Sequence, residues 1–126
     1  MNDRYLFRGK TAPSANSTHP YEWVTGAYNP FSDTITTEKR AGYPVFNSTV
    51  GQCTGLRDRN GTLIFEGDVL CDGTGGKPYT VIWEDGCFVY RDDSIVSHDL
   101  AAGADCFEII GNVHDAGGMD LVEDTT

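Results

Sequence analysis

Short hydrophobic segments alternate with polar turns along the whole of this chain of 126 residues. Turn signals recur about every ten residues, and within the segments apolar side chains recur at every second position, as in half-buried strands. No segment has the 3.6-residue repeat of an amphipathic helix. The pattern therefore predicts an all-β fold with little helix.

The clearest predicted hairpin lies in residues 79–91, YTVIWEDGCFVYR. Asp85-Gly86 suits a two-residue turn, which fixes the register of its strands. Both faces of this hairpin then carry facing apolar pairs, Trp83 with Phe88 on one face and Ile82 with Val89 on the other. We expect the Trp83 face to belong to the core and the Ile82 face to meet a second layer or another subunit.

A second set of turns organises residues 50–70, VGQCTGLRDRNGTLIFEGDVL. Asn60-Gly61 predicts a type I′ hairpin turn, because both residues tolerate positive φ, and it places Asp58 at a solvated tip. Gly67 stands between two acids and predicts a tight bend into the next strand. We interpret these carboxylates as structural, because general acid–base catalysis requires a partner with a matched pKa.

The remaining strands are weaker predictions. Gly26, within the second of them, indicates a bulge or the close approach of another backbone. The polar residues 9–20 and the glycine-rich residues 72–78 are predicted loops, and a final strand is expected to bend at Gly111. The predicted strands outside the two hairpins are residues 5–7, 21–28, 34–37, 43–46 (an edge strand, because of its proline) and 107–113.

Three blocks of this sequence resemble successive blocks of the YopX family, small proteins encoded by bacteriophages and prophages. The blocks are GLRDRNGTLIFEGDVL, VIWEDGCFVYR and FEIIGNVHD, and the opening RYLFRG is similar to the first strand of that family. The resemblance implies a mainly β architecture with an SH3-type barrel. It implies no established activity, and it brings no catalytic or ligand-binding residues.

Together these observations predict three parts of the chain. Residues 1–48 supply N-terminal β strands and loops that pack on the barrel or extend it. Residues 49–115 form the SH3-like barrel, and residues 116–126 form an acidic tail. Because no apolar run approaches the roughly 18 residues of a membrane span, and the N-terminus lacks the apolar region of a secretory signal, we expect a cytoplasmic protein of the bacterial host.

Charge is distributed unevenly along the chain, whose formal net charge is -10. Residues 1–61 carry seven Lys/Arg and five Asp/Glu, whereas residues 62–126 carry two Lys/Arg and fourteen Asp/Glu. The acidic part would repel a phosphate backbone, so direct nucleic-acid binding is disfavoured. The excess of acids has a simpler alternative explanation, which is that it keeps a small protein soluble.

The residues that most often carry chemistry are dispersed. The four cysteines show no metal-site spacing, and we expect buried reduced thiols rather than disulfides. Ser97, His98 and Asp99 are the residue types of a hydrolase triad, but neighbouring strand side chains point to opposite faces and cannot converge. The sequence predicts no enzyme, no cofactor and no metal site.

Two functional hypotheses remain. The first is a non-enzymatic interaction module that binds another protein, most simply a second copy of itself through its more basic and more acidic parts. The second is an acidic decoy that occupies a host nucleic-acid-binding protein. The predicted contact surface comprises Tyr21, Trp23, Tyr28, Ile82 and Val89, while the structural turns comprise Asn60, Gly61, Gly67, Asp85 and Gly86.

Overall fold

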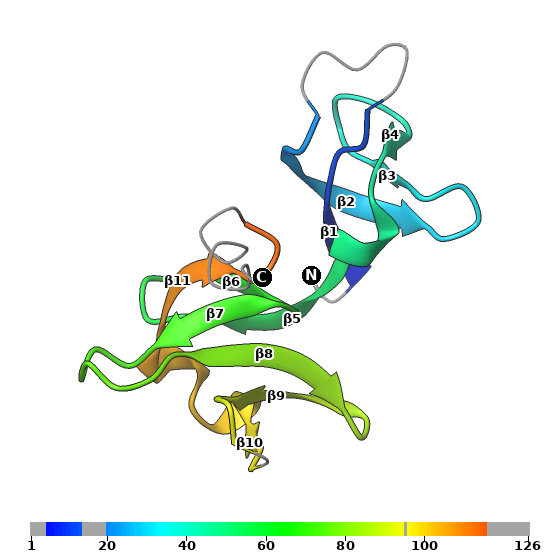
Figure 1. Ribbon diagram of the computed structural model, residues 1–126. Coiled ribbons are helices and arrows are strands. Elements are labelled where there is room, and N and C mark those ends of the chain that lie inside the picture. The colour runs from blue at the N-terminus through cyan, green and yellow to red at the C-terminus, as the bar shows by residue number, and fades with distance from the viewer. Residues whose placement is uncertain (1–4, 14–19, 95, 116–126) are drawn as a thin grey trace. The chain divides into compact units, whose positions relative to one another are not determined.

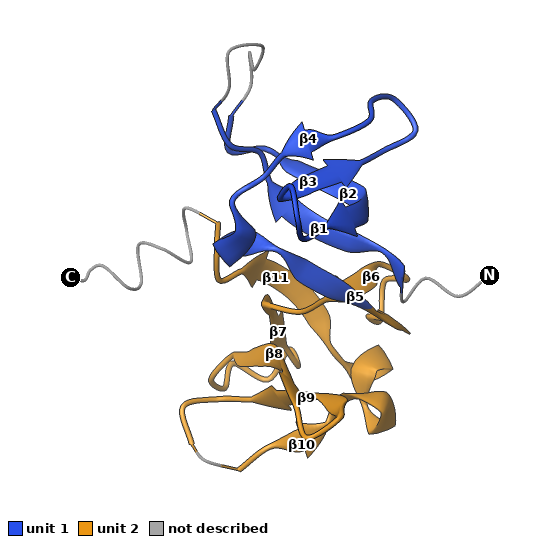
Figure 2. Cartoon of the chain, turned by 90° about the vertical axis from the view of Figure 1, so that its right-hand side faces the viewer, with its two compact units in different colours: residues 1–53 blue, residues 54–126 orange. Residues whose placement is uncertain are grey.

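The computed structural model describes residues 5–13, 20–94 and 96–115, and these are mainly strand (Figure 1). The only helical segments in these ranges are short 3-10 turns, so the all-β prediction is confirmed. The chain divides into two compact units, residues 1–53 (unit 1) and 54–126 (unit 2), as Figure 2 shows. The boundary between the units falls inside a strand, and the predicted acidic tail, residues 116–126, lies outside the described residues.

Unit 1 is built on an antiparallel sheet with the strand order β4-β3-β2-β1-β5. The 3-10 helix η2, Asn47–Thr49, precedes β5, which begins in unit 1 and continues into unit 2. The predicted strands were nearly right here, except that the first begins at Phe7 and takes in residues expected to form a loop. The strands are β1 (Phe7–Lys10), β2 (Trp23–Asn29), β3 (Thr34–Thr36), β4 (Tyr43–Pro44) and β5 (Gly51–Arg57).

Strand β2 changes partner at Gly26. Up to that residue β2 pairs with β1, and from Ala27 onward it pairs with β3. A Cβ atom at Gly26 would collide with the backbone carbonyl of Thr36, so only glycine allows the two strands to approach here. The predicted close approach of another backbone at this glycine is therefore confirmed.

Unit 2 contains a second antiparallel sheet with the strand order β10-β9-β8-β7-β11. The strand β6, Leu63–Phe65, pairs with β5, and two 3-10 turns, η3 (Leu100–Ala102) and η4 (Ala104–Cys106), lead into the last strand. The five strands of the sheet are β7 (Asp68–Cys71), β8 (Tyr79–Glu84), β9 (Cys87–Arg91), β10 (His98–Asp99) and β11 (Glu108–Asn112).

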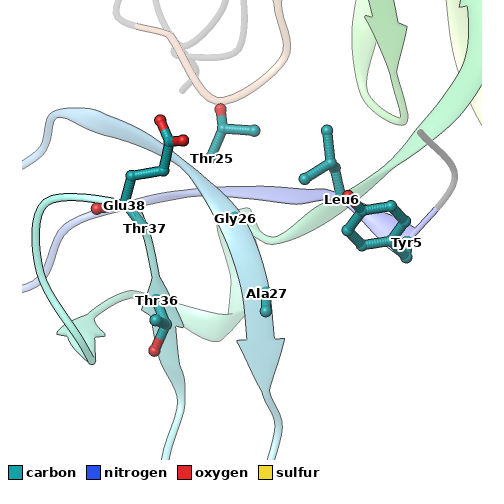
Figure 3. Close-up of a pocket in the computed structure, with 8 residues that line it drawn as sticks. All are labelled: Tyr5, Leu6, Thr25, Gly26, Ala27, Thr36, Thr37 and Glu38. Carbon is teal, nitrogen blue, oxygen red and sulfur yellow. The ribbon is translucent and has the colours of Figure 1, made fainter. Parts of the chain in front are cut away.

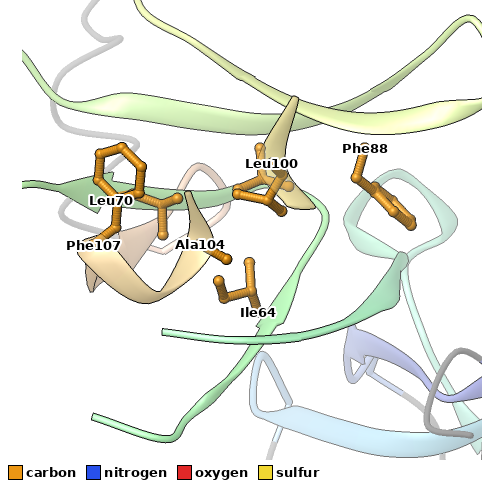
Figure 4. Packing of buried hydrophobic residues seen from close by; sticks show 7 residues of the cluster. Ile64, Leu70, Phe88, Leu100, Ala104 and Phe107 are labelled. Atoms are coloured by element: carbon orange, nitrogen blue, oxygen red, sulfur yellow. The ribbon is translucent and has the colours of Figure 1, made fainter. Parts of the chain in front are cut away.

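The hydrophobic core of unit 2 gathers side chains from strands and 3-10 turns that are distant in sequence (Figure 4). Burial of these apolar side chains is the main stabilising contribution to such a unit. Tyr79 and Tyr90 pack against the cluster from its edge. The buried cluster consists of Ile64, Leu70, Val81, Phe88, Leu100, Ala104 and Phe107.

The β8–β9 hairpin has the predicted register, with Trp83 opposite Phe88 and Ile82 opposite Val89. Asp85 and Gly86 have φ values of 53° and 86°, as a type I′ turn requires. Trp83 was nevertheless wrongly expected in the core, since 47% of it is exposed. The reason is that β7 pairs with β8 only at Thr80 and Tyr79, so the turn end of the hairpin extends beyond its neighbour.

The loop between β5 and β6 is a hairpin, as predicted, but with a different turn. Gly61 has a φ of 83°, whereas Asn60 does not have positive φ, so the predicted type I′ turn is wrong. The Gly61 amide donates to the Asp58 carbonyl at 3.0 Å, and the Asp58 amide donates to the Thr62 carbonyl at 2.9 Å. These bonds describe a three-residue loop with a left-handed glycine at its end.

Asp58 is also not at a solvated tip, because only 5% of it is exposed. Its Oδ1 accepts hydrogen bonds from the amides of Asn60 and Thr62, each at 2.9 Å. Burial by itself raises the pKa of this carboxyl, but the amide bonds from Ile109, Thr62 and Asn60 outweigh it and leave the pKa below its ordinary value. The carboxylate therefore replaces Asn60 as the group that shapes the loop.

The predicted bend at Gly67 is confirmed, with a φ of 91° between β6 and β7. Asp68 follows it and is 1% exposed. Its carboxylate accepts from the Phe65 amide at 2.8 Å and from Asn112 Nδ2 at 3.0 Å. This carboxylate thus ties the bend to β11, in the structural role that the sequence indicated.

The strands of the described residues form two antiparallel sheets and do not show the closed SH3-type barrel that the family resemblance implied. In unit 1 the segment that follows β1 pairs with the end of β4 over one short stretch. Thr11 bridges Val45, and the Ala12 amide donates to the Pro44 carbonyl at 2.8 Å. In the same ranges, no helix is long and apolar enough to cross a membrane.

Candidate protein interface

A basic and aromatic surface lies on one side of the unit 1 sheet; we name Arg8, Lys10 and Trp23 the basic face. The register places Lys10 directly opposite Trp23 and Arg8 opposite Thr25, so these side chains project from the same side of the sheet. The guanidinium carbon of Arg8 lies 4.5 Å from the Trp23 ring centroid, and Lys10 Nζ lies 5.2 Å from it. Two cations are therefore gathered over one indole.

The other side of the same strands is the packed side. A Cβ atom on Gly9 would lie 3.1 Å from Val50, 3.2 Å from Ile35 and 3.4 Å from Val45. Ile35 is fully buried, whereas Thr25 and Ala27, which follow Trp23 along its side of β2, are exposed. The basic face is thus the outward side of unit 1, and cation–π contacts of about 0.5–2 kcal/mol each keep its side chains together.

An open pocket of about 520 Å³ lies in unit 1, around the point where β2 changes partner (Figure 3). Its polar side chains are Tyr5, three threonines and one carboxylate, from Glu38. The lining contains no histidine, cysteine or lysine. The lining residues are Tyr5, Leu6, Thr25, Gly26, Ala27, Thr36, Thr37 and Glu38.

The five residues predicted to form a contact surface do not share one face. Tyr21 is 59% exposed and stacks on Phe46, with ring centroids 5.5 Å apart. Tyr28 lies on the opposite side of β2 from Trp23 and donates to Asp33 Oδ1 at 2.8 Å. Burial, followed by that hydrogen bond, raises the pKa of Tyr28.

Ile82 and Val89 belong to unit 2, where Ile82 is half-buried and Val89 is only 6% exposed. Val89 therefore offers little area to a partner. Of the five predicted residues, Trp23 is the one that the structure combines with neighbouring cations. Arg8 and Lys10 were not predicted as contact residues, because the first strand was expected to end at Phe7 and residues 9–20 were interpreted as a loop. The alternation of Arg8, Gly9 and Lys10 is nevertheless itself a strand signal.

Unit 2 presents the opposite charge, with four Lys/Arg and fifteen Asp/Glu in residues 54–126. Ion pairs among the described residues of the unit include Arg59 with Glu108 at 2.9 Å, Lys77 with Asp93 at 2.9 Å, and Arg91 with Glu84 at 3.1 Å. The acidic residues of unit 2 therefore outnumber its basic residues by fifteen to four. Unit 2 is therefore the natural complement of a cationic surface.

Hydrogen bonds within turns lower the pKa of two of these acids. The Thr74 hydroxyl and amide donate to Asp72 and lower the pKa of its carboxyl. The Ser94 amide donates to Asp92 at 2.8 Å and likewise lowers the pKa of that carboxyl. Asp72 is exposed and Asp92 is half-buried, and both lie in loops of unit 2.

The triad-like residues 97–99 are not connected to one another by any hydrogen bond among the described residues. Ser97 Oγ is buried without a hydrogen-bond partner in that part of the chain. The His98 ring stacks on Tyr90, with centroids 5.1 Å apart, and Asp99 Oδ1 accepts from the Ala101 amide at 3.0 Å. This arrangement holds no activated serine.

All four cysteines are free thiols, as expected, but only Cys53 is buried. Cys71 is half-buried, while Cys87 and Cys106 are exposed, so the prediction of general burial is wrong for these three. Within residues 5–13, 20–94 and 96–115, no three His, Cys, Asp or Glu side chains lie together in a way that would hold a metal ion.

The chain matches a known protein family over most of its length. Residues 7–119 match the family model described as YopX protein. No curated protein matches the chain. Among solved structures, the crystal structure of protein EF1440 from Enterococcus faecalis is similar, at 20% sequence identity and a TM-score of 0.45, over 89% of this chain and 85% of that chain.

Proposed function

The chain belongs to the YopX family, and we propose that it acts as a non-enzymatic protein-interaction module that associates with further copies of itself through the basic face. One observation carries the proposal: Arg8 and Lys10 converge on Trp23 on the outward side of unit 1, while unit 2 carries a large excess of acids. We place this module in the bacterial cytoplasm, in a cell carrying a phage or prophage.

The chemistry of the basic face supports a protein partner. Tryptophan and arginine are the residues that most often dominate the binding energy of protein interfaces. Here the indole already holds the two cations near one position, which reduces the side-chain ordering that binding would otherwise require. An acidic protein surface is the complement that this face fits, and unit 2 of another copy provides one.

Such an association joins two different surfaces. The basic face belongs to unit 1 and its acidic complement to unit 2. Two copies can therefore exchange this contact reciprocally in a two-fold dimer, or copies can add head to tail into a ring or an open filament. Because exposed charges are screened beyond a Debye length of about 10 Å at 0.1 M salt, the association should weaken as salt is raised.

Light scattering coupled to gel filtration tests the proposal. At about 0.02 M salt the average mass of the wild-type protein should rise with protein concentration, and at about 0.5 M salt it should return to that of a monomer. The double variant Arg8→Glu/Lys10→Glu should stay monomeric at both salt concentrations. A wild-type protein that is a strict monomer at high concentration and low salt contradicts the proposal.

The chain offers a matched control for the double variant. Lys39 and Arg40 are also basic residues of unit 1, and the Arg40 guanidinium lies 4.9 Å from the Tyr43 ring centroid. Lys39→Glu/Arg40→Glu changes the net charge by the same amount in the same unit. If the control abolishes association as fully as the first variant, net charge rather than the basic face is responsible.

The acidic decoy is a second candidate, supported by the excess of fifteen acids over four basic residues in unit 2. This function requires no self-association. A fluorescent DNA duplex bound to a purified basic bacterial DNA-binding protein should be released when the present protein is added at low salt. Absence of release at a large molar excess would rule against the decoy for that partner, while Arg8→Glu/Lys10→Glu should leave any release intact.

A further inference from the structure

The turn end of the β8–β9 hairpin displays a large aromatic side chain. Trp83 is 47% exposed, although its cross-strand partner Phe88 is only 6% exposed, and the two rings meet edge to face at 4.8 Å. Phe88 thus supports the indole from one side, while much of the indole remains accessible. A supported, half-exposed tryptophan has the properties of an interface anchor, since its apolar area is large and its position is already fixed.

An acidic group stands beside this tryptophan. Glu84 follows it and is held by Arg91 at 3.1 Å, so its charge is largely compensated within the hairpin. Asp85, at the turn itself, is exposed and enters no hydrogen bond or ion pair among the described residues. We name Trp83 and Asp85 the hairpin tip: an exposed indole followed closely by an uncompensated carboxylate.

We propose that the hairpin tip of one copy docks on the basic face of another. The two surfaces are complementary in kind, because the basic face offers two cations around an indole and the tip offers a carboxylate beside an indole. The Asp85 carboxylate pairs with the guanidinium of Arg8 or the ammonium of Lys10, and the apolar surfaces of Trp83 and Trp23 exclude water around that pair. This inference rests on the proposed self-association and names the acidic surface that it uses.

Two substitutions test the tip and keep residues suited to the backbone of the hairpin. Asp85→Asn removes the charge while keeping a residue suited to the positive φ of 53°. Trp83→Thr removes the indole and keeps a residue that favours strands. We expect Asp85→Asn to raise the dissociation constant of self-association about fivefold and Trp83→Thr to raise it at least tenfold. Substitution of a central interface anchor often has a still larger effect.

Each substitution has a matched control in unit 2. Asp105→Asn removes an exposed acid elsewhere. Ile110→Thr removes an exposed apolar side chain of a strand, since 56% of Ile110 is exposed. The dissociation constants of both controls should lie within about twofold of the wild-type value. Circular dichroism should show that all four variants are folded. If the controls weaken association as much as the tip variants, the inference is wrong.

Cross-linking then maps the contact. Cys87 is exposed next to the turn, so in a Cys71→Ser/Cys106→Ser background a maleimide photo-cross-linker can be attached at the tip, Cys53 being buried. After irradiation of a mixture of ¹⁵N-labelled and unlabelled chains at low salt, mixed-isotope cross-links should join Cys87 to the tryptic peptide of residues 11–39, which contains Trp23.

The outcomes separate the two proposals. If the protein associates but its mixed-isotope cross-links avoid residues 11–39, or do not form, the docking of the tip is wrong while self-association stands. If the wild-type protein does not associate at low salt, the proposed function fails and the docking inference fails with it.

Discussion

The Asp58 carboxylate accepts a hydrogen bond from the Ile109 amide at 3.0 Å, although the two residues are 51 positions apart. Asp58 closes the β5–β6 loop through its other oxygen, and Ile109 lies in β11. One buried side chain therefore shapes a loop and binds that loop to the last strand of unit 2. A nearby contact reinforces this link, since the Arg59 amide donates to the Phe107 carbonyl at 2.8 Å.

Asp58→Ala should destabilise the protein by roughly 2–4 kcal/mol, because three backbone amides lose a charged acceptor in a place where water replaces it poorly. Urea unfolding followed by circular dichroism measures this change. Asp72→Ala is the control, because that carboxylate is exposed and bonded only within its own loop, and it should cost less than about 1 kcal/mol. Equal losses for the two variants would contradict the role assigned to Asp58.

The stability contribution of Asp58 should depend on pH. Its pKa is lower in the folded protein than the ordinary value of 3.8, so its ionisation favours the folded state. This contribution is fully present above the unfolded-state pKa and is lost as the pH falls through the lower folded-state pKa. Urea unfolding at a series of pH values from 7 downward should show a smaller acid-induced loss of stability for Asp58→Asn than for the wild type.

Gly26→Ala should destabilise unit 1 by more than about 2 kcal/mol, because the added methyl group would collide with the Thr36 carbonyl and force β2 and β3 apart. Gly111→Ala is the comparison. A Cβ at Gly111 would meet no atom within 4 Å, and the φ of Gly111 lies outside the left-handed range. The free energy of unfolding of that variant should therefore lie within about 0.5 kcal/mol of the wild-type value. A Gly26→Ala protein as stable as the wild type would show that β2 and β3 separate without cost.

Phe88→Ala should cost about 3–5 kcal/mol, the usual range for a buried aromatic residue, whereas Trp83→Ala should cost about half as much. The difference follows from exposure, since Trp83 is 47% exposed and Phe88 only 6%. Thermal unfolding of the two variants side by side measures it. An equal or larger loss for Trp83→Ala would place the indole in the core, against the structure.

Local signals predicted the hairpins well, because turn chemistry acts over a few residues. Asp85-Gly86 determined the register of β8 and β9 completely, since both positions require positive φ. At Asn60-Gly61 the same reasoning gave the hairpin but not the turn, because the Asp58 carboxylate binds the amides of Asn60 and Thr62 and favours a longer loop. The burial of Trp83 depends on how many residues of β8 are paired with β7, and no local sequence pattern indicates that number.

The basic face was harder to predict than the strands. Trp23 was recognised as a contact residue, but its charged neighbours become visible only when β1 is placed opposite β2. The strand actually extends to Lys10, and the pairing of Lys10 with Trp23 brings together residues separated by the polar segment between them. Cross-strand neighbours of this kind are set by register, which an isolated sequence specifies only where a tight turn joins the strands.

The link between Asp58 and β11 also bears on the order in which the protein folds during its synthesis. The pairings within unit 1 are complete once residue 52 has been made, and the β8–β9 hairpin is complete at residue 91. The Asp58 carboxylate receives its donor from β11 only after residue 109 has left the ribosome. Closure of unit 2 is therefore a late, non-local event, and the nascent chain carries an unfinished sheet edge along β7 until then.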